Sequence, residues 1–169
     1  ALPEARFVNQ YGPTEATASC TYYVVPGLVG ADDVLPIGVP YPHYRIFLLR
    51  EDGSAAPDGE LGEICVSGPT LALGYYNDPE RTASCFVQNP LHNAYHDRIY
   101  KTGDLGLRTP DGNLEFHGRK DRQIKHLGHR VELGEIDLAA AQMPGVTDCC
   151  TLYDAVRELS LIHISEPTR

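Results

Sequence analysis

The chain has 169 residues, of which 42% are hydrophobic and 22% are charged, and its formal net charge is −9. This size and composition indicate about one domain of an ordinary globular protein. The negative charge disfavours a nucleic-acid or membrane surface, which needs clustered Lys and Arg, and no apolar run reaches the roughly 18 residues that a bilayer span requires. The five cysteines are odd in number and form no Cys-x-x-Cys, which favours a reducing cytoplasm over a disulfide framework.

The first part of the chain has the pattern of short strands separated by turns. Residues 6–9 predict the end of a buried strand, which runs into the turn-rich segment 11–15. Further strands are expected over residues 44–49 and 63–66, where β-branched and aromatic residues gather. Between them, residues 51–54 contain Asp-Gly, which tolerates the positive φ angles of a hairpin turn. These elements predict a small sheet or barrel.

A short helix is expected from Pro79 to about Phe86. Asn77 or Asp78 would cap its first turn with a side-chain oxygen. Pro79 would take the first helical position, where its missing N–H removes no hydrogen bond.

The pattern changes after residue 119. Residues 98–108 and 113–118 predict two paired strands around a turn that contains Asp-Gly. Apolar residues then recur at helical spacing over an alanine-rich stretch: Leu133, Ile136, Ala140 and Met143. Gly145 would end this helix, and a strand would follow over residues 146–153. The change predicts a strand–helix–strand unit that begins near residue 122 and a domain boundary at residues 119–122.

Four sequence blocks resemble the motifs of the adenylate-forming superfamily in order and in spacing. They are residues 9–15 (Asn-Gln-Tyr-Gly-Pro-Thr-Glu); residues 59–64, followed by Gly68 and Gly74-Tyr75; residues 100–105 (Tyr-Lys-Thr-Gly-Asp-Leu); and residues 118–125, followed by Gly128, Arg130 and residues 132–137. The resemblance implies a mixed α/β fold class. Residues 1–120 would be the β-rich, C-terminal part of the large AMP-binding domain. Residues 121–158 would be the hinge and the start of the small α+β C-terminal lid domain.

The last block favours the amino-acid-activating branch of this superfamily. Gln123 and the Glu-Leu-Gly of residues 132–134 match amino-acid adenylation domains, both those of nonribosomal peptide synthetases and the D-alanine–carrier protein ligases; Asp137 replaces their usual Glu. The resemblance implies an acid–thiol ligase that uses ATP and Mg²⁺ to form an aminoacyl-AMP from an amino acid and then loads the phosphopantetheine of a carrier protein. The alternatives are an acyl-CoA or aryl-CoA ligase of the same superfamily and a non-catalytic scaffold domain that retains the fold.

By the same resemblance, the first block binds the base and the phosphates of ATP. Tyr11 offers a flat aromatic face to adenine, Asn9 can read the adenine edge with its amide, and Gly12 lies in the same turn. Thr14 can donate its hydroxyl to the α-phosphate, and Glu15 can bind Mg²⁺, which usually takes one or two carboxylates plus phosphate oxygens. Thr14 and Glu15 are therefore candidate catalytic residues.

Two later residues complete the expected ATP site, and three more belong to the parts that move in the family. Asp104 can accept hydrogen bonds from the ribose hydroxyls, and Arg119, also a candidate catalytic residue, can reach ribose or phosphate with its planar guanidinium. Asp121 occupies the hinge position. Lys125 and Gly128 lie in the loop that faces the pantetheine arm.

Each residue has an ordinary structural interpretation when it is taken alone. Tyr11 would then be a core aromatic, Asp104 a turn residue and Glu15 a charge at a helix N-terminus. The order of the four blocks favours the functional interpretation.

The two ends of the chain carry separate expectations. The family's Gly/Ser/Thr-rich phosphate loop and its C-terminal catalytic Lys have no match here, so the chain alone is expected not to form an adenylate. Residues 159–169 resemble a translated sequencing adapter, and a native strand over residues 159–164 is the alternative.

Overall fold

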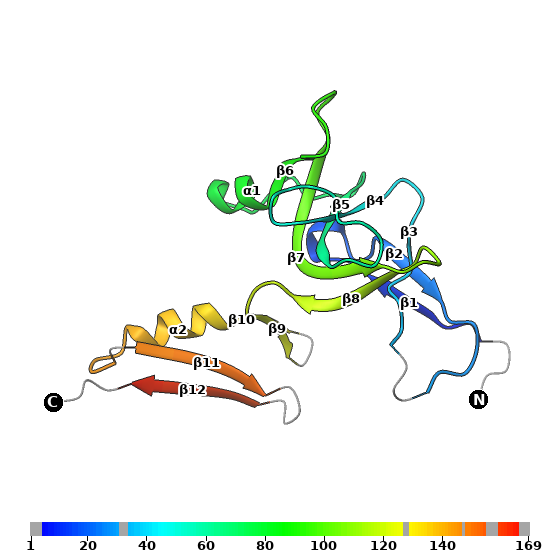
Figure 1. The fold of residues 1–169 in the computed structure, drawn as a ribbon. Coiled ribbons are helices and arrows are strands. Elements are labelled where there is room, and N and C mark those ends of the chain that lie inside the picture. The colour runs from blue at the N-terminus through cyan, green and yellow to red at the C-terminus, as the bar shows by residue number, and fades with distance from the viewer. Residues whose placement is uncertain (1–4, 31–33, 127–128, 147, 155–158, 166–169) are drawn as a thin grey trace. The chain divides into compact units, whose positions relative to one another are not determined.

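The computed structural model describes residues 5–30, 34–126, 129–146, 148–154 and 159–165. The chain divides into two compact units, Ala1–Lys120 and Asp121–Arg169 (Figure 1). The first unit is built mainly of strands, and the second of strands and a helix. No helix in the described part of the chain is long and apolar enough to cross a bilayer.

A five-stranded antiparallel sheet forms the body of the first unit. Four strands follow in the spatial order β4 (Arg45–Leu49), β5 (Gly62–Ser67), β7 (Arg98–Arg108) and β6 (Phe86–Gln88), and β8 (Leu114–Arg119) also pairs with β7. The strands predicted over residues 44–49, 63–66, 98–108 and 113–118 are thereby confirmed. β6 has no counterpart among the predicted strands.

The apolar core of this unit gathers around β5. Ile64 and Val66 are completely buried and belong to one cluster with Ile46, Leu48 and Leu114. Ile46 lies opposite Val66 and Leu48 opposite Ile64 in the ladder, so side chains that alternate along the two strands meet on the same face. Each buried aliphatic side chain stabilises the fold by roughly 1.5–3 kcal/mol relative to an exposed one. The strands from which the loops at the edges of the sheet leave are therefore held in place by this core.

Two local predictions in this unit are also confirmed. The turn after β4 contains Gly53 at φ 83°, in the region that Asp-Gly was expected to supply. Helix α1 (Pro79–Cys85) begins with proline, and Asp78 caps it by accepting the backbone N–H of Arg81 at 2.9 Å. The helix ends one residue earlier than predicted, because Phe86 already begins β6.

A smaller sheet carries the first sequence block. Its strands are β1 (Val8–Tyr11), β2 (Thr21–Val24) and β3 (Val39–Pro40), paired antiparallel in that order. The strand predicted over residues 6–9 is wrong in position by two residues and wrong in burial. Pairing with β2 begins at Val8, and exposed and half-buried residues alternate along β1 because only one of its faces is covered.

The second unit consists of a hairpin, a helix and a strand pair. β9 (Gln123–His126) pairs with β10 (His129–Glu132), α2 (Leu133–Ala141) follows, and β11 (Asp148–Asp154) pairs with β12 (Leu159–Ser165). The predicted helix is confirmed, although it ends at Ala141 rather than near Met143. The predicted strand begins two residues later than expected. β12 covers most of the segment that resembles an adapter, whose origin stays a prediction.

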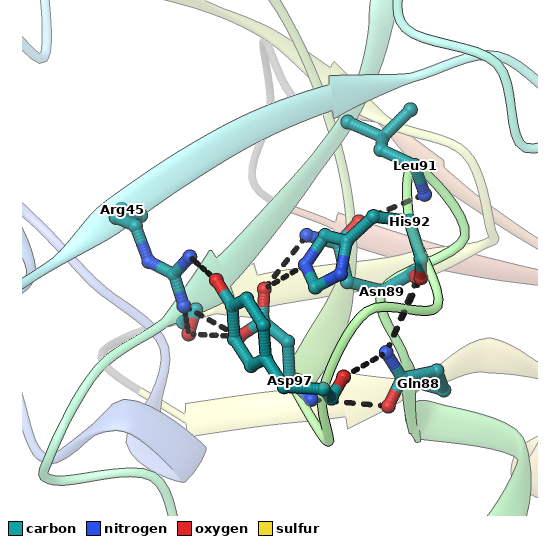
Figure 2. Close-up of polar contacts among 8 residues, drawn as sticks. Arg45, Gln88, Asn89, Leu91, His92 and Asp97 are labelled. Atoms are coloured by element: carbon teal, nitrogen blue, oxygen red, sulfur yellow. Dashed lines mark hydrogen bonds and ion pairs between the residues drawn. The ribbon is translucent and has the colours of Figure 1, made fainter.

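A buried polar cluster fastens the connection between β6 and β7 (Figure 2). The Asp97 side chain accepts hydrogen bonds from Asn89 Nδ2 at 2.9 Å and His92 Nε2 at 3.0 Å, and it pairs with Arg45. Its backbone N–H donates to Gln88 Oε1 at 3.0 Å. Burial raises the pKa of Asp97, but the hydrogen bonds from Asn89, His92 and Arg45 outweigh burial and lower this pKa to about 2. An ionised carboxylate therefore closes the loop over residues 89–97.

Candidate functional site

The first sequence block folds as a tight loop between β1 and β2. The chain leaves β1 at Tyr11, forms a short 3-10 helix, η1 (Thr14–Ala16), and returns so that the Cys20 N–H donates to Tyr11 O at 2.8 Å. A Cβ atom on Gly12 would lie 2.5 Å from Ser19 Cα, so only glycine fits where the two arms of the loop approach. Of the predicted site residues of this block, Asn9 and Tyr11 lie on β1, and Gly12, Thr14 and Glu15 lie in the loop that follows it.

The Asp104 carboxylate connects three of the four sequence blocks. Tyr11 Oη donates to Asp104 Oδ2 at 2.5 Å, and Arg119 Nη1 donates to Asp104 Oδ1 at 2.6 Å. Arg119 also donates to Thr102 O at 3.1 Å. Burial, followed by the negative charge of Asp104, raises the pKa of Tyr11 above its ordinary value, so its hydroxyl stays protonated as a donor. The structure thus brings together Tyr11, Asp104 and Arg119, which lie far apart in the sequence.

Glu15 lies in a second polar group on the same loop. Its side chain is buried, and Tyr75 Oη donates to Glu15 Oε1 at 2.7 Å. The Tyr75 and Tyr100 hydroxyls are 3.2 Å apart. Burial raises the pKa of Tyr75 to about 12, with a further contribution from its bond to Glu15; burial also raises the pKa of Tyr100. Both phenols therefore stay protonated near the Glu15 carboxylate.

The surroundings of Glu15 fit a magnesium ion that has most of its ligands from phosphate and water and only one from the protein. Within the described residues, no three His, Cys, Asp or Glu side chains gather as a metal-binding group. Mg²⁺ usually takes one or two protein carboxylates, with phosphate oxygens and water completing its octahedron. Glu15 could supply one such carboxylate, and the hydrogen bond from Tyr75 orients it.

The remaining residues of the first block occupy less enclosed positions. Asn9 lies on the same face of β1 as Tyr11. Its amide nitrogen donates one hydrogen to Pro36 O at 2.8 Å, which leaves the side-chain oxygen and the second amide hydrogen for a contact with a base. Thr14 is exposed at the start of η1, where its hydroxyl is accessible to a ligand.

The predicted hinge and pantetheine residues lie in the second unit. Asp121 is its first residue, and Asp121 Oδ1 accepts the backbone N–H of Gln123 at 3.1 Å. Lys125 pairs through its backbone with Arg130 across the hairpin of β9 and β10. Gly128 lies outside the described residues.

Sequence reasoning missed three side chains that support the site: Tyr75, Tyr100 and Glu63. Tyr75 and Tyr100 face Glu15, as described above. Glu63 accepts the N–H of Gly103, the neighbour of Asp104, at 3.1 Å. All three belong to the sequence blocks that resemble the superfamily. Their place in these blocks marked them as candidates, but it did not predict which residue each would contact.

Comparison with known proteins agrees with this geometry. Residues 1–76 match the family of AMP-binding enzymes. Over 151 residues, 89% of the chain, it is 46% identical to zwittermicin A synthase ZmaJ of Bacillus cereus. Its structure is similar to the crystal structure of IdnL1, with a TM-score of 0.89 and 33% identity over 98% of the chain. The chain belongs to the adenylate-forming superfamily.

The chain corresponds to only part of these relatives. It spans 28% of the length of ZmaJ and 34% of IdnL1. It is also similar to PA1221, a nonribosomal peptide synthetase protein that contains adenylation and PCP domains and was solved in its holo form with a vinylsulfonamide inhibitor. The sequence identity is 34% and the TM-score is 0.82. The match covers 95% of this chain and 28% of PA1221. The expected mixed α/β fold of a fragment of the superfamily is confirmed.

Proposed function

We propose that this chain forms part of the nucleotide site of an ATP-dependent amino-acid-activating ligase. The observation that carries the proposal is the Asp104 carboxylate, which is bonded at once to Tyr11 and Arg119. Since these residues come from separate blocks of the superfamily pattern, their meeting at one carboxylate supports a shared ligand. Glu15 on the same loop as Tyr11 supplies the group for a divalent cation.

The activation step would be a displacement at phosphorus. A carboxylate oxygen of the amino acid attacks the α-phosphorus of ATP, the bond to the β-phosphate oxygen breaks, and pyrophosphate leaves with its electron pair. The chain's contribution is positioning and charge stabilisation. Thr14 would donate its hydroxyl to an α-phosphate oxygen, and Arg119 would reach ribose or phosphate. Mg²⁺, when bound at Glu15, would neutralise phosphate charge.

Asp104 would recognise the ribose. An ionised carboxylate offers about four lone-pair sites, and Tyr11 and Arg119 occupy one on each oxygen. The remaining sites can accept the two ribose hydroxyls while both protein bonds persist. Tyr11 would then lie beside the nucleoside with its hydroxyl anchored and its ring face available to adenine.

The second half-reaction would pass the aminoacyl group to a carrier protein. The pantetheine sulfur attacks the aminoacyl carbonyl carbon, a thioester forms, and AMP leaves. Asp121 would act as the hinge, and Lys125 and Gly128 would face the pantetheine arm. The description of PA1221 as a protein with adenylation and PCP domains supports a carrier-protein partner. The five free cysteines support a reducing, cytoplasmic location.

The test is amino-acid-dependent exchange of pyrophosphate into ATP by the full-length protein that contains this chain. We expect exchange with an amino acid, loss of exchange in Glu15→Ala, and no exchange by residues 1–169 alone. Exchange only with fatty or aryl acids would instead indicate an acyl-CoA or aryl-CoA ligase. ATP binding without exchange for any acid would indicate a scaffold domain.

A further inference from the structure

Glu63 is a buried carboxylate for which the proposed reaction has no use. Its side chain is 11% exposed in the middle of the main sheet, on β5. Glu63 Oε1 accepts the backbone N–H of Gly103 at 3.1 Å. Glu63 Oε2 lies 3.8 Å from Lys101 Nζ and 3.6 Å from Lys120 Nζ. A carboxylate in this position therefore bonds to the backbone next to Asp104 and faces two cations.

The backbone that Glu63 binds is a bulge in the ladder between β5 and β7. Glu63 lies opposite Leu105, but Cys65 lies opposite Lys101, so residues 102–104 face the single residue Ile64. Gly103 adopts φ 74°, a left-handed conformation that favours glycine. Bulges redirect side chains and leave backbone groups without ladder partners. Asp104, whose side chain contacts Tyr11 and Arg119, is the last residue of this bulge.

Side chains replace the ladder bonds that the bulge removes. Glu63 takes the N–H of Gly103, and Thr102 Oγ1 accepts the N–H of Asp104 at 3.0 Å while donating to Ile64 O at 2.7 Å. The carbonyl of Gly103 accepts the backbone N–H of Lys120 at 2.8 Å. Among these bonds, only the one that Glu63 accepts from the Gly103 N–H involves a carboxylate. Hydrogen bonds to a charged group are stronger than those between neutral groups.

We propose that Glu63 is a positioning residue for Asp104: by binding the Gly103 N–H it fixes the bulge in the conformation that presents the Asp104 carboxylate to the ribose of the nucleotide. This inference rests on the proposed function. Lys101 and Lys120 balance the buried charge of Glu63 and attach residue 120, the last of the first unit, to the same carboxylate. Glu63 touches no substrate and acts only through Gly103.

The test compares binding of ATP and 2′-deoxy-ATP to the full-length protein by equilibrium dialysis. Loss of a residue that merely stabilises the fold would weaken the binding of both nucleotides equally. Loss of the ribose contact would instead remove the preference for ATP over 2′-deoxy-ATP. The variants are Glu63→Ala, the conservative Glu63→Gln, Asp104→Asn and the control Glu60→Ala. Glu60 is an exposed carboxylate on the same segment that pairs with Arg50 at 2.6 Å.

We expect the wild-type protein and Glu60→Ala to prefer ATP by about tenfold or more, the value of a hydrogen bond to a charged group. Asp104→Asn and Glu63→Ala should bind the two nucleotides with nearly equal affinity. Glu63→Gln should keep most of the preference, since its amide oxygen can still accept the Gly103 N–H.

The outcomes separate the two proposals. Glu63→Ala with an unchanged preference for ATP, beside an Asp104→Asn variant that has lost it, overturns the role of Glu63 alone. No preference in the wild-type protein, or a preference that survives Asp104→Asn, overturns the proposed ribose contact itself. If Glu63→Ala does not fold, a loss of the preference in Glu63→Gln equal to that in Asp104→Asn contradicts the proposal.

Discussion

Asp97 and Asp104 lie seven residues apart, one just before β7 and one within it, and they have much in common. Both are nearly buried, at 4% and 8% exposure, and each pairs with an arginine. They differ in how their partners use them. Asp97 is surrounded by side chains that close a loop, including Asn89 and His92. Within the described residues, the Asp104 carboxylate accepts one side-chain hydrogen bond on each oxygen, from Tyr11 and from Arg119, and both donors belong to blocks of the superfamily pattern.

Burial and an arginine partner therefore do not by themselves identify a functional carboxylate. What separates the two aspartates is the remaining capacity to accept hydrogen bonds and the origin of the donors. A carboxylate that its own loop has saturated serves the fold. A carboxylate held in place by a few donors from distant loops can still receive a ligand.

The largest expected effect is on catalysis at Asp104. Asp104→Asn replaces one acceptor oxygen with an amide nitrogen, so either Tyr11 or Arg119 loses its acceptor and fewer acceptor sites remain for the ribose. We expect kcat/KM for pyrophosphate exchange by the full-length protein to fall by about 100-fold, equivalent to roughly 3 kcal/mol. Asp97→Asn should retain activity within about threefold. Equal losses in the two variants would remove the distinction between the two aspartates.

The next effect is on local stability at Asp97. Asp97→Ala leaves the donors of Asn89 and His92 without their acceptor, and we expect a cost of about 2 kcal/mol, or roughly 30-fold faster amide hydrogen exchange over residues 89–97. Asp58→Ala is the control, because the Asp58 side chain is 70% exposed and lies 3.6 Å from Arg108. Unchanged exchange over residues 89–97 in Asp97→Ala would show that the cluster does not fasten the loop.

The same cluster predicts a dependence of stability on pH. The pKa of Asp97 is about 2 in the folded chain, against about 3.9 for an unfolded aspartate. The folded state therefore binds fewer protons, so the stabilisation is complete above about pH 4 and is lost as the pH falls toward 2. Hydrogen exchange over residues 89–97 between pH 5 and pH 2, corrected for intrinsic rates, measures this. Asp97→Asn should flatten the response, and a variant as steep as the wild type would contradict the assignment.

The smallest effect concerns the orientation of Glu15. Tyr75→Phe removes the donor to Glu15 Oε1, whereas Tyr76→Phe alters the adjacent tyrosine, which is 94% exposed. We expect a three- to tenfold weaker affinity for Mn²⁺ in the presence of ATP for Tyr75→Phe, about the net value of one hydrogen bond, and no change for Tyr76→Phe. Electron paramagnetic resonance of free Mn²⁺ measures the affinity without turnover. Identical affinities would assign Tyr75 to the fold alone.

Local chemistry made much of the fold predictable. Asp78 and Pro79 predicted the start of α1, and the strand-like segments on either side of Asp-Gly predicted the pairing of β7 with β8. Only one strand was expected before α2, and the pairing of β9 with β10 was missed because these short strands are rich in charged and polar residues and lack a period-2 pattern. The strand around residue 8 was misplaced because β1 is set by its pairing with β2, which a local pattern does not contain.

The sequence predicted that residues of separate blocks lie together, whereas their binding of a nucleotide stays a prediction. The order of the blocks placed Tyr11, Asp104 and Arg119 on one nucleotide, and the structure joins them at one carboxylate. The support of Glu15 by Tyr75 was not predictable, because the two lie 60 residues apart and no local pattern pairs a phenol with a carboxylate. The bulge at Gly103 depends on the register of two strands, which sequence patterns specify poorly.

The most direct test of the central claim is a crystal structure of the full-length protein with a non-hydrolysable ATP analogue. We expect both ribose hydroxyls within about 3 Å of the Asp104 carboxylate, with the bonds from Tyr11 and Arg119 retained. A nucleotide bound elsewhere, or a ribose that makes no contact with Asp104, would contradict it.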